Sequence, residues 1–166
     1  MQEIYASGSE GGYHYEEIAQ YCKDNNIHGW GQVLTHMPAI QAKFVENFTS
    51  LEDKLGFKIK SVVSHGDFVN RILKHSNYEL LTPEIREQLG VELEGCDPVL
   101  VDSYNCIQSD KPYPQLYREQ QTPEEAVNSG VPVVYLLTHP RHWYRSVWIN
   151  LKDNMLRLKE VNGYKQ

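Results

Sequence analysis

A chain of 166 residues, of which 40% are hydrophobic and 23% charged, has the composition of an ordinary globular protein, and we expect one domain over residues 1–166. The net charge of -6 with scattered Lys and Arg argues against nucleic acid as a partner, because phosphate binding depends on clustered basic residues. No apolar run is long enough to span a bilayer and the N-terminus lacks a secretory signal, so we expect a cytoplasmic protein without a membrane partner.

The first third of the sequence predicts two helices. Apolar residues at helical spacing over 16–25 favour a short amphipathic helix. A longer helix is predicted to begin at Thr35 or His36, because Pro38 would then lie in the first turn, where its missing N–H has no partner anyway. Its apolar stripe consists of Ile40, Phe44, Phe48, Leu51 and Leu55. Gly56 is expected to end this helix as a C-terminal cap.

Three apolar runs predict strands, and each delivers polar residues at its C-terminal end. The runs cover residues 58–64, 98–103 and 131–138. His65 follows the first run, Asp102 lies near the end of the second, and His139 follows the third. Between the last two runs, Thr122 is expected to cap a helix, and a final helix is predicted over residues 143–160.

The order of these elements predicts an α/β fold with about four parallel strands. Strands that alternate with helices form parallel sheets. In such folds, ligands bind at the C-terminal ends of the strands. We therefore expect the chemistry of this protein at His14, His65, Asp102 and His139.

Four segments carry a family resemblance. Residues 11–16 place His14 after two glycines, and residues 64–66 are Ser-His-Gly. Residues 136–143 contain His-Pro after a pair of leucines and a threonine, and residues 148–159 form the predicted terminal helix. In their order and spacing, these segments resemble the polysaccharide deacetylase superfamily, in the form of its divergent members.

The resemblance implies an incomplete (β/α) barrel of the polysaccharide deacetylase type, which is similar to a TIM barrel, with flanking helices. The chain would be the C-terminal part of this barrel, completed by a second copy or by a missing N-terminal half. The implied activity is metal-dependent hydrolysis that removes acyl groups from N- or O-acylated carbohydrate. The implied substrate is a carbohydrate, and the implied cofactor is a divalent metal, zinc being the usual choice.

Two departures from the family pattern leave alternatives open. The family's aspartate motif, which carries the catalytic base and a metal ligand, lies upstream of the histidine motif, and only thirteen residues precede His14 here. The second metal histidine of the family falls four residues after the first, where this chain has Ile18. The chain is therefore an active hydrolase, a catalytically inactive carbohydrate-binding or assembly module, or a truncated gene product.

The resemblance and the residue chemistry together suggest individual roles. His14 and His65 are the predicted metal ligands, because imidazole is a favoured ligand of zinc. His139 is the predicted general acid, since histidine titrates near neutral pH, and Asp102 is predicted to orient it. Each histidine has a purely structural alternative, such as capping a helix or fixing a turn.

The remaining candidates are aromatic residues and other histidines. Trp30 and Trp143 flank the predicted loops and are expected to contact the substrate by stacking against a sugar ring. Four histidines lack a second ligand at useful spacing and are expected at the surface: His28, His36, His75 and His142.

Overall fold

The computed structural model describes residues 7–111 and 121–164. Its contacts divide the chain into two compact units, unit 1 (Met1–Asp97) and unit 2 (Pro98–Gln166). Each unit has its own strands and helices, and the single domain over residues 1–166 stays a prediction. Among the described residues, no helix combines the length and the apolar character needed to cross a bilayer.

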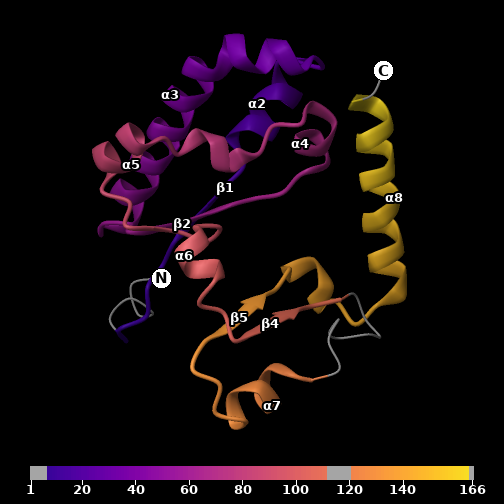
Figure 1. Cartoon of the computed structure of the whole chain (residues 1–166). Coiled ribbons are helices and arrows are strands. Elements are labelled where there is room, and N and C mark those ends of the chain that lie inside the picture. Colours follow the sequence, from indigo (N-terminus) through magenta and orange to yellow (C-terminus); the bar gives the residue numbers. More distant parts are fainter. Residues whose placement is uncertain (1–6, 112–120, 165–166) are drawn as a thin grey trace. The chain divides into compact units, whose positions relative to one another are not determined.

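Unit 1 contains a parallel sheet of three strands and the helices that connect them (Figure 1). Its elements are β1 (Tyr13–Tyr15), α2 (Glu17–Asp24), α3 (Trp30–Leu55), β2 (Ser61–Ser64), α4 (Phe68–Leu73), η1 (Asn77–Leu80), α5 (Pro83–Leu89) and β3 (Leu93–Glu94). The strand order is β1-β2-β3, so β2 is the central strand. The C-terminal ends of β1 and β2 therefore lie side by side, with Tyr15 opposite Ser64.

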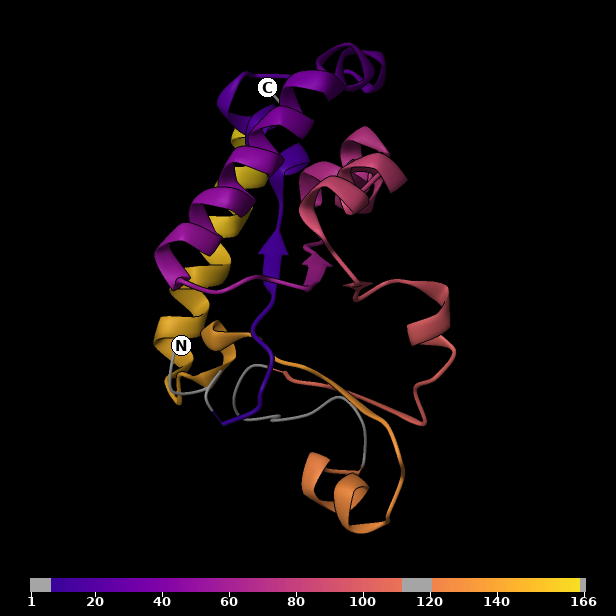
Figure 2. The same cartoon turned by 90° about the vertical axis from the view of Figure 1, so that its left-hand side faces the viewer.

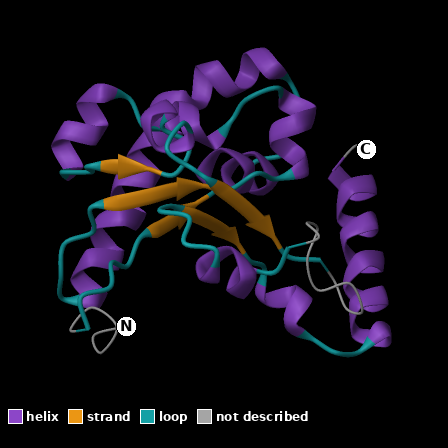
Figure 3. Ribbon diagram, turned by 60° about the horizontal axis from the view of Figure 1, so that its bottom comes forward, coloured by secondary structure: helices purple, strands orange, loops and turns teal. Residues whose placement is uncertain are grey.

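Unit 2 contains a parallel pair of strands (Figure 3). Its elements are α6 (Pro98–Val101), β4 (Cys106–Ser109), α7 (Pro123–Asn128), β5 (Val134–Leu137), η2 (Pro140–Trp143) and α8 (Val147–Tyr164). β4 pairs with β5 from Cys106 opposite Val134 to Ser109 opposite Leu137. The predicted cap of α7 is confirmed, because the Thr122 hydroxyl accepts a hydrogen bond from the Glu125 N–H at 3.2 Å.

The α/β class and the parallel direction of the strands are confirmed. The predicted strands over 58–64 and 131–138 correspond to β2 and β5. The described strands form two open sheets, one of three strands and one of two, and no closed barrel. The barrel of the polysaccharide deacetylase type therefore stays a prediction.

The predicted strand over residues 98–103 is wrong. Pro98–Val101 forms the short helix α6, and the strand of this region is β4, further along the chain. A short apolar run fits a strand or a helix equally well, and proline is favoured at the first position of a helix. Val99 is 86% exposed, so this run does not form a buried strand.

The long helix α3 begins earlier than predicted, at Trp30 rather than at Thr35 or His36. Its start is fixed by the Gly29 N–H, which donates to the Gln32 side chain at 3.0 Å. Pro38 thus lies inside the helix. The predicted end is confirmed, because Gly56 has a φ of 74° in the left-handed region and caps the helix.

The core of unit 1 lies between the sheet and α3, which runs along the strands (Figure 2). Phe44 and Phe48 of the predicted apolar stripe are fully buried. The Tyr15 ring lies 4.9 Å from the Phe44 ring, and the Tyr13 ring lies 6.1 Å from it. Because side chains alternate along a strand, His14 faces the opposite side of the sheet from these two tyrosines.

The close approach of β1 to β2 explains why residue 12 is a glycine. A Cβ atom at Gly12 would lie 2.9 Å from the backbone oxygen of Ser61, so the paired backbone would have to shift. We expect Gly12→Ala to lower the free energy of unfolding by about 1–3 kcal/mol, measured by urea denaturation. The matched control is Gly31→Ala within α3, where a Cβ meets no atom within 4 Å. This control is expected to retain full stability, and an equal effect of both substitutions would contradict the steric argument.

Candidate functional site

The fold brings His14 and His65 together. His14 lies within β1, and His65 directly follows β2. The Nε2 atom of His14 lies 3.1 Å from the Nδ1 atom of His65, although the two residues are 51 positions apart. The backbone after β2 is held in place, because the His65 N–H donates to Tyr15 at 2.7 Å and Asn77 donates to the His65 carbonyl at 2.6 Å. The structure thus places these two predicted site residues side by side, and their role as metal ligands stays a prediction.

Two carboxylates lie close to this histidine pair. The Oε2 atom of Glu16 lies 3.8 Å from the Nε2 atom of His65. Glu16, His65 and Asp67 form a group whose ligand atoms lie within 4.8 Å of one another. The Asp67 carboxylate already has two other partners. It caps α4 by accepting the Val69 N–H at 2.9 Å, and it forms an ion pair with Lys23 at 3.3 Å. Glu16 is therefore the better placed carboxylate.

The separation of the two histidine nitrogens can be compared with that of two nitrogens bound to one metal. Two nitrogens bound to one tetrahedral zinc at about 2.0–2.1 Å lie about 3.3–3.4 Å apart. The observed separation of 3.1 Å between His14 Nε2 and His65 Nδ1 is close to this value. A hydrogen bond between two neutral imidazoles needs a proton on one of these nitrogens, whereas a metal needs the lone pairs of both. Metal binding would therefore require a change of tautomer in one ring.

Ile18 contributes to the core and not to the site. It is fully buried on α2, and its backbone N–H donates to Asn77 at 3.0 Å. A side chain at position 18 consequently points away from His14. The carboxylate of Glu16, which precedes α2, lies 3.8 Å from His65 Nε2 and is the closer candidate.

Unit 2 contains a second cluster, formed by Asp110, His139 and His142. Asp110 directly follows β4 and is buried. Its Oδ1 atom lies 2.7 Å from His139 Nδ1, and its Oδ2 atom accepts the His139 backbone N–H at 2.6 Å. The Nδ1 atom of His142 lies 3.1 Å from the same Oδ1, although poorly aligned for a hydrogen bond. The buried carboxylate thus fixes the His139 ring and leaves Nε2 for chemistry.

The carboxylate that contacts His139 is Asp110, and not Asp102 as predicted. Asp102 follows α6 and is exposed. This error has the same origin as the misplaced strand. The strand of this region ends at Ser109, so the polar residue at its C-terminal end is Asp110 rather than Asp102. His142 was also expected at the surface, yet its side chain is only 10% exposed. His75 is likewise buried, with Nδ1 2.6 Å from Glu79.

The two tryptophans proposed to contact a sugar differ in what the structure describes. Trp30 is the first residue of α3 and is 56% exposed, with its ring stacked on His75 at 5.5 Å between centroids. The Trp143 side chain lies outside the described part of the structure, although η2 includes its backbone. Because His14 and His65 belong to unit 1 and His139 to unit 2, a common cleft for these histidines stays a prediction.

Asp110 gives unit 2 a pH-dependent stability. Burial alone would raise the pKa of its carboxyl, but the hydrogen bonds from His139 and the nearby imidazole of His142 hold that pKa below its usual value. A depressed pKa stabilises the folded state fully above the unfolded value of about 3.9, and this contribution is lost as the pH falls through the folded value.

We expect Asp110→Asn to lower the free energy of unfolding at pH 7 by about 1–3 kcal/mol and to flatten its dependence on pH below about 4. Urea denaturation between pH 3 and 7, roughly spanning these values, measures both effects. Asp102→Asn, at an exposed position, is the matched control and should keep the wild-type profile. Identical profiles for the two variants would show that Asp110 does not stabilise the fold through its charge.

Comparisons with protein-family models, with curated proteins and with solved structures found no match for the chain. The resemblance to polysaccharide deacetylases therefore stays a prediction, and the geometry of the two clusters is what bears on function.

Proposed function

We propose that this chain is a metal-dependent hydrolase that removes acyl groups from N- or O-acylated carbohydrate, with a divalent metal such as zinc bound by His14 and His65. The observation that carries this proposal is the 3.1 Å separation of His14 Nε2 and His65 Nδ1 at the ends of two neighbouring parallel strands. Strand ends of this kind are where α/β proteins place their chemistry. The resemblance to polysaccharide deacetylases supports the choice of reaction.

Each residue of the proposed machinery has a role that follows from its contacts. When bound, a divalent ion polarises the acyl carbonyl and lowers the pKa of its bound water. Glu16 would accept a hydrogen bond from His65 Nε2 and so keep the Nδ1 lone pair available to the metal. In unit 2, Asp110 holds Nδ1 of His139 and leaves Nε2 available as a proton donor for general acid catalysis.

The alternative is a catalytically inactive carbohydrate-binding or assembly module, and one observation favours it. Position 18, which carries the family's second metal histidine, is an isoleucine fully buried in the core. Among the described residues, the histidine pair thus has two imidazoles and the Glu16 carboxylate nearby, while the Asp67 carboxylate is paired with Lys23. We expect this set to bind zinc more weakly than a site with three firmly placed protein ligands.

Calorimetric titration with zinc tests the metal site. We expect binding to the wild-type chain to weaken at least about tenfold in His14→Ala and in His65→Ala, because each substitution removes one of two imidazole ligands, and tenfold corresponds to about 1.4 kcal/mol. His28→Ala removes an exposed histidine that lies outside the site and should leave affinity unchanged. Equal affinities in all four proteins would contradict the proposed site.

Acetate release from an acetylated chito-oligosaccharide separates the enzyme from the inactive module. Release that depends on zinc and on His139 supports the hydrolase, because general acid catalysis contributes about 10²–10⁴-fold to the rate. Binding of the oligosaccharide without release supports the module. Submicromolar zinc affinity that disappears in His14→Ala would show that the chain builds a complete metal site, and the inactive module would then have to be dropped.

A further inference from the structure

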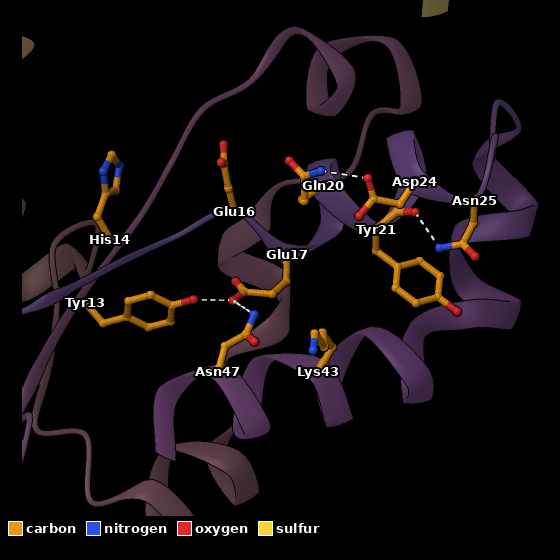
Figure 4. A pocket seen from close by; sticks show the side chains of 10 residues that line it. All are labelled: Tyr13, His14, Glu16, Glu17, Gln20, Tyr21, Asp24, Asn25, Lys43 and Asn47. Atoms are coloured by element: carbon orange, nitrogen blue, oxygen red, sulfur yellow. Dashed lines mark hydrogen bonds between the residues drawn. The ribbon is translucent and has the colours of Figure 1, made fainter. Parts of the chain in front are cut away.

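The side chain of Glu17 is buried with only half of its carboxylate paired. Its Oε1 atom accepts hydrogen bonds from the Tyr13 hydroxyl and from Asn47 Nδ2, the latter at 3.0 Å (Figure 4). Burial, followed by the neighbouring Glu17 carboxylate, raises the pKa of Tyr13 well above its usual value, so this hydroxyl remains a donor. Glu17 is 5% exposed, and no donor among the described residues reaches its Oε2 atom.

An unpaired oxygen of this kind is costly. A buried polar atom without a partner destabilises a protein by about 1–3 kcal/mol, and more when the group is charged. Lys43 is close enough to line the same pocket, but its ammonium pairs with Glu46 at 2.9 Å. The donor that Glu17 Oε2 lacks is therefore expected from a bound molecule.

The carboxylate of Glu17 lies at a pocket of about 460 Å³. This volume is within the range of about 300–1,000 Å³ that small-molecule sites occupy. One face of α2 lines the pocket with residues at helical spacing: Glu17, Gln20, Tyr21 and Asp24 (Figure 4). A carboxylate thus stands at each end of this face, separated by seven residues or about 10 Å along the helix, with an aromatic ring between them.

The charged side chains that line the pocket favour binding of a cation. Its lining includes three carboxylates, from Glu16, Glu17 and Asp24, and one ammonium, from Lys43. Three negative charges and one positive charge leave a net charge of two negative. A ligand with two or more positive charges is therefore favoured, and anions such as phosphate esters are disfavoured.

We propose that this pocket binds an aliphatic polyamine, a linear molecule with protonated amines at both ends. One terminal ammonium donates to Glu17 Oε2, and the other pairs with Asp24. The methylene chain between them lies against the Tyr21 ring, where a nearby secondary ammonium gains a cation–π contact. Spermidine has the required length, since its terminal nitrogens are about 11 Å apart when the chain is extended with bonds of about 1.5 Å.

The residues that anchor the polyamine, Glu17 and Asp24, differ from the proposed metal ligands, His14 and His65. His14 and Glu16 nevertheless border the same pocket. Because Oε2 is enclosed, entry of the ligand requires flexible side chains of the pocket, such as Lys43 and Gln20, to move aside. Both side chains are exposed, and the ligand would take the place of the Gln20 amide, which donates to Asp24 at 2.8 Å.

Calorimetric titration of the full chain with spermidine at low salt tests the proposal. We expect Glu17→Gln to weaken binding at least about tenfold, the effect of losing about 1.4 kcal/mol, because it removes the charge while keeping the shape of the side chain. Asp24→Asn should weaken binding several-fold. Glu87→Gln, at an exposed position of α5 outside the pocket, is the matched control and should bind as the wild type does. Butylamine, with a single ammonium, should bind more weakly than spermidine.

Two outcomes would overturn the proposal. No spermidine binding at low salt would show that the pocket takes no polyamine. Equal loss of binding in Glu17→Gln, Asp24→Asn and Glu87→Gln would show a general attraction to a chain with a net charge of -6. Circular dichroism verifies the fold of each variant, and because Asp24 is exposed, its variant provides a test even if Glu17→Gln fails to fold.

Discussion

Asn77→Ala is expected to lower the free energy of unfolding by about 2–4 kcal/mol and to weaken zinc binding at the histidine pair. Asn77 is 1% exposed and joins α2 to the segment after β2. Its Oδ1 atom accepts from the Ile18 N–H at 3.0 Å, and its Nδ2 atom donates to the His65 carbonyl at 2.6 Å. Alanine would leave both of these groups without their partner, and each unsatisfied group costs about 1–3 kcal/mol.

Urea denaturation and zinc titration measure the two effects of Asn77→Ala. Asn25→Ala is the matched control, because its exposed amide donates to the carbonyl of Tyr21 at 2.9 Å and lies away from His65. We expect little change in stability and none in zinc affinity for this control. A destabilised Asn77→Ala variant with unaltered zinc affinity would show that His65 does not depend on this anchor.

The second large effect is expected at Glu94, a fully buried carboxylate in β3. It accepts the Ser64 N–H at 2.8 Å and the Cys96 N–H, and the Tyr15 hydroxyl lies 3.5 Å from it. Glu94→Ala leaves these donors unpaired and opens a cavity beside the strand end that leads to His65. We expect a loss of about 3–5 kcal/mol in the free energy of unfolding.

Urea denaturation of Glu94→Ala is best compared with that of Glu92→Ala. Glu92 lies two residues away and forms an exposed ion pair with Lys60 at 2.7 Å, which is worth about 0–1 kcal/mol. Glu94→Gln keeps one acceptor oxygen and should recover part of the stability lost in Glu94→Ala. Similar losses for the variants at positions 92 and 94 would mean that the buried hydrogen bonds of Glu94 contribute little.

The sequence predicted those parts of the fold that depend on local pattern. The apolar stripe with Phe44 and Phe48 predicts α3, and Gly56 predicts its end, because both signals act within one element. The approach of His14 to His65 also follows from sequence, since parallel neighbouring strands bring their C-terminal ends together.

Features that depend on distant partners were not predicted. The strand preceding Asp110 could not be distinguished from the apolar run at 98–103 by composition alone, so the partner of His139 was misassigned. Nothing local marks Glu17 or Glu94 as buried, because their burial results from packing against residues far along the chain. A charged side chain in the core is identified only when the whole unit is assembled.

The contact between His14 and His65 also has a consequence for the folding of unit 1. His14 lies in β1 and His65 directly follows β2, so the two residues are 51 positions apart, and closing a loop of that length costs entropy. A metal ion that binds both imidazoles only when the strands are paired shifts the equilibrium toward the folded state by mass action. The ion that is proposed to serve catalysis would thus also stabilise the pairing of β1 with β2. A chelator would then lower the free energy of unfolding of unit 1 in addition to removing the proposed activity.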